Sequence, residues 1–193
     1  MNKNDPRFIT AEKKIFEAVY ALFPHKDIES IKTQDIITCA GIHKSTFYSH
    51  YRDKYALIDA LVDVVVEKLA PHLESITLNM LGRDADEDRL RQSYKSLANS
   101  IYDNREMLLA VLQSSMGQSL ITKIESELKD IWNKSGIADP ESRNIDYLIN
   151  GAAFIIIGTI DKWLQRDCVD SIDALAWLIN ATGEGIRYAF ALL

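Results

Sequence analysis

The feature that most limits the possible folds of this chain is the spacing of its apolar residues, which recur three and four positions apart along nearly its whole length. In the stretch 15–23 this spacing places five apolar side chains, from Ile15 to Phe23, on one face of a helix. We find no run of alternating apolar and polar residues bounded by hairpin turns, which would indicate strands. The spacing therefore predicts an all-α protein.

Turn and capping residues divide the chain into about nine predicted helices. Pro24 ends the first helix, Asp53 can cap the fourth, and Pro71 is expected to kink or break the fourth. Asp139-Pro140-Glu141 is a start signal for a long helix near the C-terminus. The predicted helices are 10–23, 33–39, 44–50, 54 onward past Pro71, 87–103, 105–115, 118–134, 141–167 and 172–191.

The net charge of −6 is unevenly distributed along the chain. Residues 1–54 hold nine Lys/Arg and seven Asp/Glu, a net charge of +2, and three of the four His. Residues 55–193 hold 13 Lys/Arg and 21 Asp/Glu, a net charge of −8. This asymmetry favours an N-terminal part that meets polyanions, with a chance surface composition as the alternative.

Several classes of protein are disfavoured by the sequence. The first residues lack the apolar region of a signal peptide, and the longest apolar run, 151–160, is too short to span a bilayer. Cys39 and Cys168 fit no metal or redox spacing, and we find no phosphate-binding loop or nucleophile motif. We therefore expect a soluble, cytoplasmic protein that is not an enzyme, with no catalytic residue, metal, cofactor or membrane partner.

The stretch from Ala40 to Leu57 combines many hydrogen-bonding side chains with a few apolar ones. A helix at 33–39, a turn containing Gly41 and a short helix at 44–50 have the helix-turn-helix arrangement. Gly41 suits the left-handed conformation that ends a helix. The spacing alone fits either a DNA-binding motif or a helical hairpin with a polar surface.

A helix that enters the DNA major groove must be held by apolar contacts and be polar on its outer face. Ile36, Ile42 and Phe47 can form the holding face. The residues predicted to contact bases or phosphates are Thr33, His43, Lys44, Ser45, Thr46, Tyr48, His50 and Lys54.

Residues 33–59, TQDIITCAGIHKSTFYSHYRDKYALID, resemble the DNA-binding signature of the TetR family of bacterial transcriptional regulators. The matching positions are Thr33, Asp35, Ile36, Ala40, Gly41, Lys44, Thr46, Tyr48, His50, Lys54 and Leu57. The departures from the family pattern are Ile37, His43, Ser45, Tyr55 and Ala56. The resemblance implies a three-helix helix-turn-helix DNA-binding domain at 1–54 and a larger helical ligand-binding and dimerisation domain at 55–193.

The segment 147–165 is apolar around most of its circumference, so the predicted helix must be covered on two sides. One side can face its own domain and the other a second subunit, although a central helix buried in a monomer is the alternative. The residues expected at the dimer interface are Gly151, Ile155, Gly158, Leu175, Ile179 and Ile186. The run 151–175 also resembles the C-terminal domain of dihydroxyacetone-kinase operon regulators.

A ligand pocket is expected among the helices of the larger domain, and core packing alone is the alternative for each candidate. The candidates are Tyr94, Ile101, Met107, Val111, Met116, Leu128, Trp132 and Phe154. The resemblance implies a dimeric repressor that binds a pseudo-palindromic operator in double-stranded DNA and is released by a small-molecule effector. The alternative interpretation is a sensor or coactivator of the same fold that does not bind DNA.

Overall fold

The computed structural model describes residues 5–26, 28–81, 86–135 and 143–190, and every regular element within these ranges is helical. The prediction of an all-α fold is therefore confirmed. The described helices are α1 (Pro6–Leu22), the short 3₁₀ helix η1 (Phe23–His25), α2 (Thr33–Ala40), α3 (Lys44–His50), α4 (Lys54–Leu81), α5 (Glu87–Asp103), α6 (Arg105–Leu112), α7 (Gly117–Ser135), α8 (Arg143–Gln165) and α9 (Ile172–Phe190).

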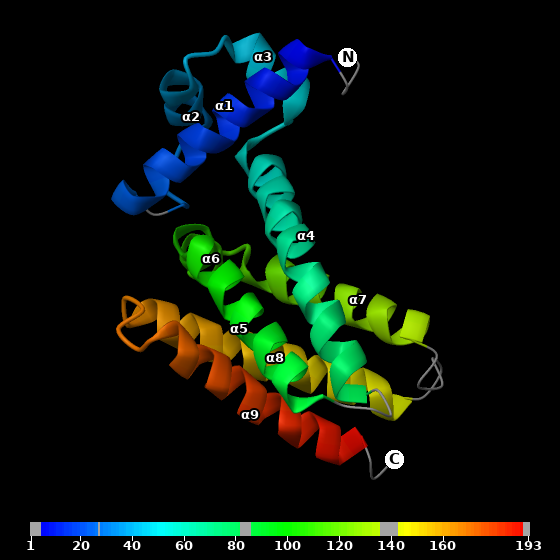
Figure 1. Ribbon diagram of the computed structural model, residues 1–193. Helices are drawn as coiled ribbons and strands as arrows, with labels where there is room; N and C mark the ends of the chain where they lie inside the picture. The colour runs from blue at the N-terminus through cyan, green and yellow to red at the C-terminus, as the bar shows by residue number, and fades with distance from the viewer. Residues whose placement is uncertain (1–4, 27, 82–85, 136–142, 191–193) are drawn as a thin grey trace.

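The helices form a small N-terminal group and a larger C-terminal group, joined by the long helix α4 (Figure 1). In the small group, α1 packs against α2 and α3. In the larger group, α5 packs between α4 and α9, while α7 packs against α4 and α8. Helices α8 and α9 lie side by side at the edge of this group (Figure 1). The N-terminal helix-turn-helix part is thus followed by a larger helical region.

Helix α1 begins at Pro6, four residues before the predicted start at Thr10. Asp5 caps it, because its Oδ1 atom accepts a hydrogen bond of 2.8 Å from the backbone N–H of Arg7. Proline suits the first helical turn, where a backbone N–H has no partner within the helix. The prediction relied on the apolar stripe, which begins later than these capping residues.

Helix α4 continues through Pro71 to Leu81, so the proline does not end it. Asp53 caps α4 as predicted, since its Oδ1 accepts a 2.8 Å hydrogen bond from the N–H of Ala56. The start signal Asp139-Pro140-Glu141 lies outside the described residues, and α8 is described from Arg143.

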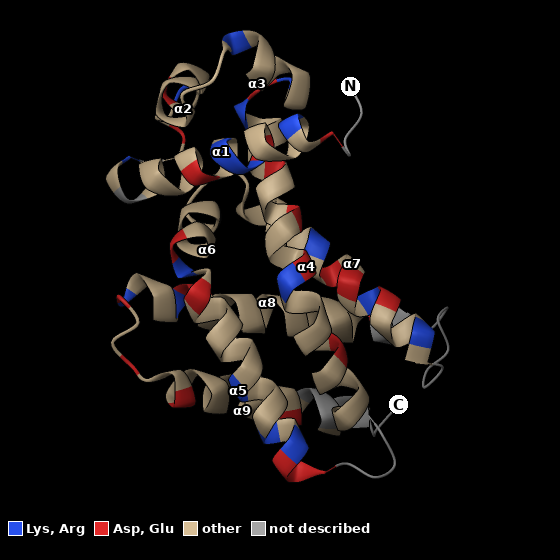
Figure 2. Ribbon diagram, turned by 45° about the horizontal axis from the view of Figure 1, so that its top comes forward, with Lys and Arg blue, Asp and Glu red and all other residues tan. Residues whose placement is uncertain are grey.

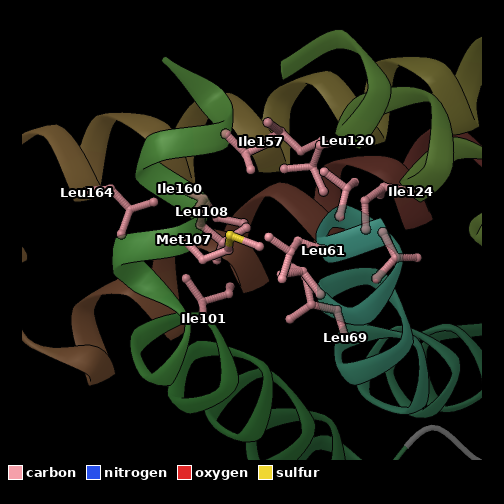
Figure 3. Close-up of a cluster of buried hydrophobic side chains, with 14 of the residues drawn as sticks. Leu61, Leu69, Ile101, Met107, Leu108, Leu120, Ile124, Ile157, Ile160 and Leu164 are labelled. Atoms are coloured by element: carbon pink, nitrogen blue, oxygen red, sulfur yellow. The ribbon is translucent and has the colours of Figure 1, made fainter. Parts of the chain in front are cut away.

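Buried apolar side chains form one continuous cluster that extends from the small helical group through α4 into the larger one. Phe47 and Leu57 at one end and Leu61 along α4 have no exposed surface. Figure 3 shows the part of this core where side chains from α4 to α8 converge, including Leu69, Leu108 and Ile160. The interior thus connects the helix-turn-helix to the C-terminal helices through packed side chains.

Within the described residues, one helical segment, Asp146–Gln165 of α8, is long and apolar enough to cross a bilayer. This segment is longer than the apolar run 151–160, on which the expectation from the sequence rests. Of its most apolar window, 39% is buried inside the molecule, and α8 packs against α6, α7 and α9. Core helices of soluble proteins have this length and composition, so α8 is a partly buried core helix.

Candidate nucleic-acid interface

The turn between α2 and α3 is built on Gly41, whose backbone is left-handed at φ 61° and ψ 39°. A residue without Cβ adopts this conformation at little cost, which allows α2 to stop sharply. The N–H of Ile42 then donates to the carbonyl of Ile37 at 3.3 Å. His43 is the N-cap of α3 and makes no side-chain capping bond, which leaves its exposed ring available on the outer surface.

Phe47 anchors α3 to the rest of the small helical group. Its side chain is fully buried, and its ring lies 5.5 Å from that of Tyr48 and 6.2 Å from that of Tyr51. Ile36 from α2 is buried, and Ile42 packs against the same core. The three residues predicted to hold the second helix therefore do so.

The opposite face of α3 is polar and open to solvent. Lys44, Ser45 and Tyr48 are exposed, and Thr46 and Thr33 are half-buried. Lys44 Nζ lies 5.8 Å from the centre of the Tyr48 ring, within range of a cation–π contact. The exposed face of α3 can donate and accept hydrogen bonds, while the buried face holds the helix in position.

His50 does not lie free on this surface, contrary to the prediction of a phosphate contact. Its ring stacks on that of Phe8 with the centroids 3.7 Å apart, and both ring nitrogens are buried without a hydrogen-bond partner among the described residues. Burial lowers the pKa of His50, because water no longer stabilises the charged ring. The start of α1 covers this ring, which the local sequence around His50 does not reveal.

Lys54 was also predicted to contact phosphate, but its ammonium group is engaged within the protein. Lys54 Nζ donates to the backbone carbonyls of Ile28 and Glu29 at 3.2 and 2.7 Å. It therefore ties the connection between α1 and α2 to the first turn of α4. Any contact with DNA must be made alongside these bonds or in their place.

The described acidic groups of residues 5–54 are all engaged. Their partners include backbone N–H groups for Asp5 and Asp53, the Tyr51 hydroxyl for Glu12, and lysines for Glu17 and Asp35. Within the same described segment, five side-chain cations have no carboxylate within ion-pair distance: Arg7, Lys14, Lys32, Lys44 and Lys54, of which Lys54 is held by backbone carbonyls. Positive charge on α1 and α3 is thus left for an external anion (Figure 2).

A surface groove beside the turn adds two of these cations to the candidate interface. Arg7 and Lys14 of α1 line it together with Thr10 and Ile42, and its volume is about 350 Å³. The two cations are seven residues apart, which places them on one face of α1. The sequence reading missed them because it considered only the helix-turn-helix motif, although this spacing was visible.

One carboxylate connects the N-terminal part to the larger helical region. Glu29 Oε1 accepts hydrogen bonds from the N–H and the hydroxyl of Ser115 at 3.2 and 2.6 Å. Its other oxygen accepts from the Tyr55 hydroxyl at 3.3 Å. The bonds to Ser115 are the main cause that lowers the pKa of Glu29, so this carboxyl is ionised at neutral pH.

The structure brings together three of the eight predicted pocket residues. Tyr94, Leu128 and Trp132 line one apolar cavity of about 50 Å³. Ile101, Met107 and Val111 are buried in the core, and Met116 packs against it. Phe154 is 48% exposed and lies on the outer side of α8, because the apolar circumference of this helix faces both inward and outward.

The predicted interface residues are divided between two faces. Gly151 is half-buried, while Ile155 and Gly158 lie exposed on α8. Leu175 and Ile179 are instead fully buried inside the protomer, because the more apolar stripe of α9 faces its own core. Trp177 and Leu178 of α9 occupy the outer face. The side chain of Ile186 lies outside the described residues.

Comparisons with known proteins agree with this geometry. Residues 15–61 match the family model of the bacterial regulatory proteins of the tetR family. The chain is 20% identical over 179 residues to the uncharacterized HTH-type transcriptional regulator YxbF of Bacillus subtilis (strain 168). This alignment covers 86% of the chain and 43% of YxbF, so the chain matches less than half of that relative.

Solved structures of similar fold cover nearly the whole chain. The TetR family repressor FadR of Thermus thermophilus, in complex with lauroyl-CoA, is 16% identical with a TM-score of 0.59, covering 91% of this chain and 92% of FadR. The dihydroxyacetone kinase operon activator DhaS is also 16% identical with a TM-score of 0.59, covering 93% of this chain and 98% of DhaS. At such identities the likeness concerns the fold.

The matched segment contains the buried anchor, the left-handed glycine turn and the polar outer helix that were described above. The remaining helices follow in an arrangement shared with solved regulators over more than nine-tenths of the chain. This family is non-enzymatic, in agreement with the sequence. Residues 15–61 thus match the helix-turn-helix of the tetR family of bacterial regulatory proteins, and the whole chain has the fold of solved regulators of that family.

Proposed function

We propose that this protein is a cytoplasmic, homodimeric repressor that binds a pseudo-palindromic operator and is released from it by a small-molecule effector. The observation that carries the proposal is the polar face of α3, which is exposed while Phe47 on the other side of the helix is fully buried. Lys44, Ser45, Thr46 and Tyr48 are the proposed DNA-contacting residues of this face, with Thr33 and His43 beside them.

The charge distribution supports the same proposal. Cations without carboxylate partners lie on α1 and α3 in the described N-terminal part, and phosphates are the anions that such groups meet on DNA. The domain boundary is proposed at the start of α4, so that residues 1–54 bind DNA and residues 55–193 bind the effector and the second subunit.

Fluorescence anisotropy with DNA from upstream of the protein's own gene tests the proposal. We expect a Kd below about 1 μM at low salt, with log affinity falling steeply and linearly against log salt concentration. Lys44→Ala is expected to weaken binding to all sequences, while Ser45→Ala or Thr46→Ala changes the preference among them. An absence of binding at low salt would remove the repressor proposal.

A sensor or coactivator that does not bind DNA is the second candidate. Two observations favour this candidate. The ring of His50 is covered by Phe8, and the ammonium group of Lys54 is held by two backbone carbonyls. In the anisotropy experiment this candidate predicts effector binding together with no binding to the upstream DNA.

The proposed dimer uses the outer faces of α8 and α9. Ile155 is 54% and Trp177 is 66% exposed, and Phe154 and Leu178 line a surface groove of about 400 Å³ with Gly158. An added Cβ at Gly158 would meet nothing within 4 Å in the protomer, so a partner helix can approach closely there. Large apolar groups gathered on one face favour burial against a second copy.

Light scattering tests this assembly, and the expected mass is twice the 21.9 kDa of the chain. Ile155→Glu is expected to give the monomer mass, because a charge would be buried without a partner in the interface. Glu127→Gln on α7 is a control that changes one charge elsewhere. A wild-type mass of 21.9 kDa at micromolar concentration would remove the dimer proposal.

The effector part of the proposal is supported by the apolar cavity beside Tyr94 and Trp132. A regulator of similar fold, FadR, has been solved with lauroyl-CoA bound. In a two-fold dimer the recognition helices would lie about 34 Å apart, one turn of DNA. An effector releases the operator only if it binds better to the protein with a different spacing.

A further inference from the structure

We propose that the effector site is elongated and takes a neutral, chain-like apolar molecule, which fills two cavities that are now separated by three side chains. The inference deepens the proposed function and rests on its effector-binding part. The first cavity, of about 50 Å³, lies among α4, α5, α7, α8 and α9. Tyr94 and Trp132 line it, and both are almost fully buried.

A second cavity of about 30 Å³ lies nearer the N-terminal end of α4, beside α6. Its lining is entirely aliphatic and includes Leu69, Leu108, Leu120, Ile124 and Ile160. Figure 3 shows these side chains converging from α4, α6, α7 and α8. The sequence predicts a single pocket rather than two.

The two cavities share a wall made of Leu73, Leu97 and Ile156, which line both. Rotation of flexible side chains in such a wall would join the cavities into one channel without breaking any polar contact. Neither cavity alone approaches the roughly 300 Å³ of a site for a drug-sized ligand. The joined site would be narrow and long, and it fits an extended chain better than a compact ring system.

The chemistry of the lining sets the charge of the ligand. Among the described residues, no Asp, Glu, Lys, Arg or His lines either cavity. The polar groups on the lining side chains are the hydroxyls of Thr77 and Tyr94 and the indole N–H of Trp132, all in the first cavity. A buried ionised group would have no partner there and would be strongly disfavoured. A neutral molecule with one polar end, directed toward Thr77, satisfies this lining.

Helix α4 contains a proline beside the wall that the two cavities share. Pro71 lies inside the helix, between Leu69 of the second cavity and Leu73 of the shared wall. A proline in this position removes one hydrogen bond of the helix and favours a bend. The same helix begins beside the DNA-binding part, at Lys54. Bending of α4 can therefore enlarge the site and, at the same time, move the N-terminal helices.

Isothermal titration calorimetry of the full chain with straight-chain alcohols tests the proposal. We expect the affinity to rise about three- to fourfold for each added methylene from 1-hexanol to 1-decanol, as expected for burial of CH₂ groups. Decanoate and decylammonium, which have the same chain with a charged end, are expected to bind at least about tenfold more weakly than 1-decanol. Equal binding of the charged chains, or no binding of 1-decanol, would overturn the proposal.

A substitution in the shared wall tests the length of the site. Ile156 is half-buried and lines both cavities, so Ile156→Phe should block the passage between them. We expect this variant to lose the gain of 1-decanol over 1-hexanol. Ile121→Phe is the matched control, since Ile121 is also half-buried but lines neither cavity. An unchanged gain in Ile156→Phe, folded by circular dichroism, would contradict a joined site.

The ligands of different chain length and charge are measured on the wild-type protein. The proposal therefore stays testable even if Ile156→Phe does not fold. DNA binding is measured separately, by anisotropy with and without 1-decanol. Binding of 1-decanol without release of DNA would support the site and contradict effector release. Binding of DNA with no binding of any alcohol would leave the regulator proposal in place and overturn the site.

Discussion

Glu29 and Ser115 are joined by two hydrogen bonds, from the N–H and the hydroxyl of the serine to one carboxylate oxygen of the glutamate. The first residue lies between α1 and α2, and the second lies between α6 and α7. Together with the bonds of Lys54, this contact fixes the connection that precedes the helix-turn-helix. It is a direct polar link between the N-terminal helices and the larger helical region.

Removing this link should loosen the connection between α1 and α2. Ser115→Ala deletes the 2.6 Å hydroxyl bond and leaves the weaker N–H bond. We expect faster amide hydrogen exchange at residues 28–31 and a loss of stability of about 1 kcal/mol or less, because the bond is exposed. Ser126→Ala on the exposed side of α7 is the control. Unchanged exchange at 28–31 would show that the link does not hold the connection.

The stacking of His50 on Phe8 predicts a pH-dependent stability. The pKa of His50 is lowered in the folded protein, so the unfolded chain binds more protons below its ordinary pKa of about 6.5. The stabilisation is complete above this ordinary value and is lost as the pH falls toward the lowered one. The negative charge of Glu12 raises the pKa of His50, but this effect is smaller than the lowering by burial.

Urea unfolding at pH 7.5 and pH 5.5 measures this effect. The wild-type protein should be less stable at the lower pH, and His50→Phe should show a smaller difference, because it keeps a ring against Phe8 but cannot be protonated. His25→Phe, at an exposed position, is the control. An equal pH dependence in wild type and His50→Phe would mean that the stacked ring is not responsible.

Much of this arrangement followed from the sequence because helices leave a local signature. The apolar spacing and Gly41 located α2, α3 and their turn to within a residue. The Phe8–His50 stack joins residues far apart in the chain, and nothing near either residue indicates the other. The same limit explains Leu175 and Ile179, because periodicity identifies an apolar face but not whether its partner is the same chain or another.

Arg7 is predicted to extend the DNA contact beyond α3. It lines the groove beside Ile42 and has no carboxylate partner among the described residues. If its guanidinium neutralises one phosphate, Arg7→Ala should reduce the slope of log affinity against log salt by about 0.9 and weaken binding to all sequences equally. Lys134→Ala, an exposed cation of α7, is the matched control and should leave the slope unchanged. A slope unaltered by Arg7→Ala would place the DNA contact on α3 alone.

The close approach of α5 and α9 at Gly183 predicts that this glycine is sensitive to substitution. A Cβ added at Gly183 would overlap the hydroxyl of Tyr94, so the buried Tyr94 ring would have to shift. Gly183→Ala is therefore expected to cost about 1–3 kcal/mol in urea unfolding, the range of overpacked cores. Gly185→Ala on the same helix is the control, since an added Cβ meets nothing within 4 Å there. Restoration of stability in the double variant with Tyr94→Phe would identify the hydroxyl as the obstacle, whereas equal stability of the two alanine variants would contradict the close packing.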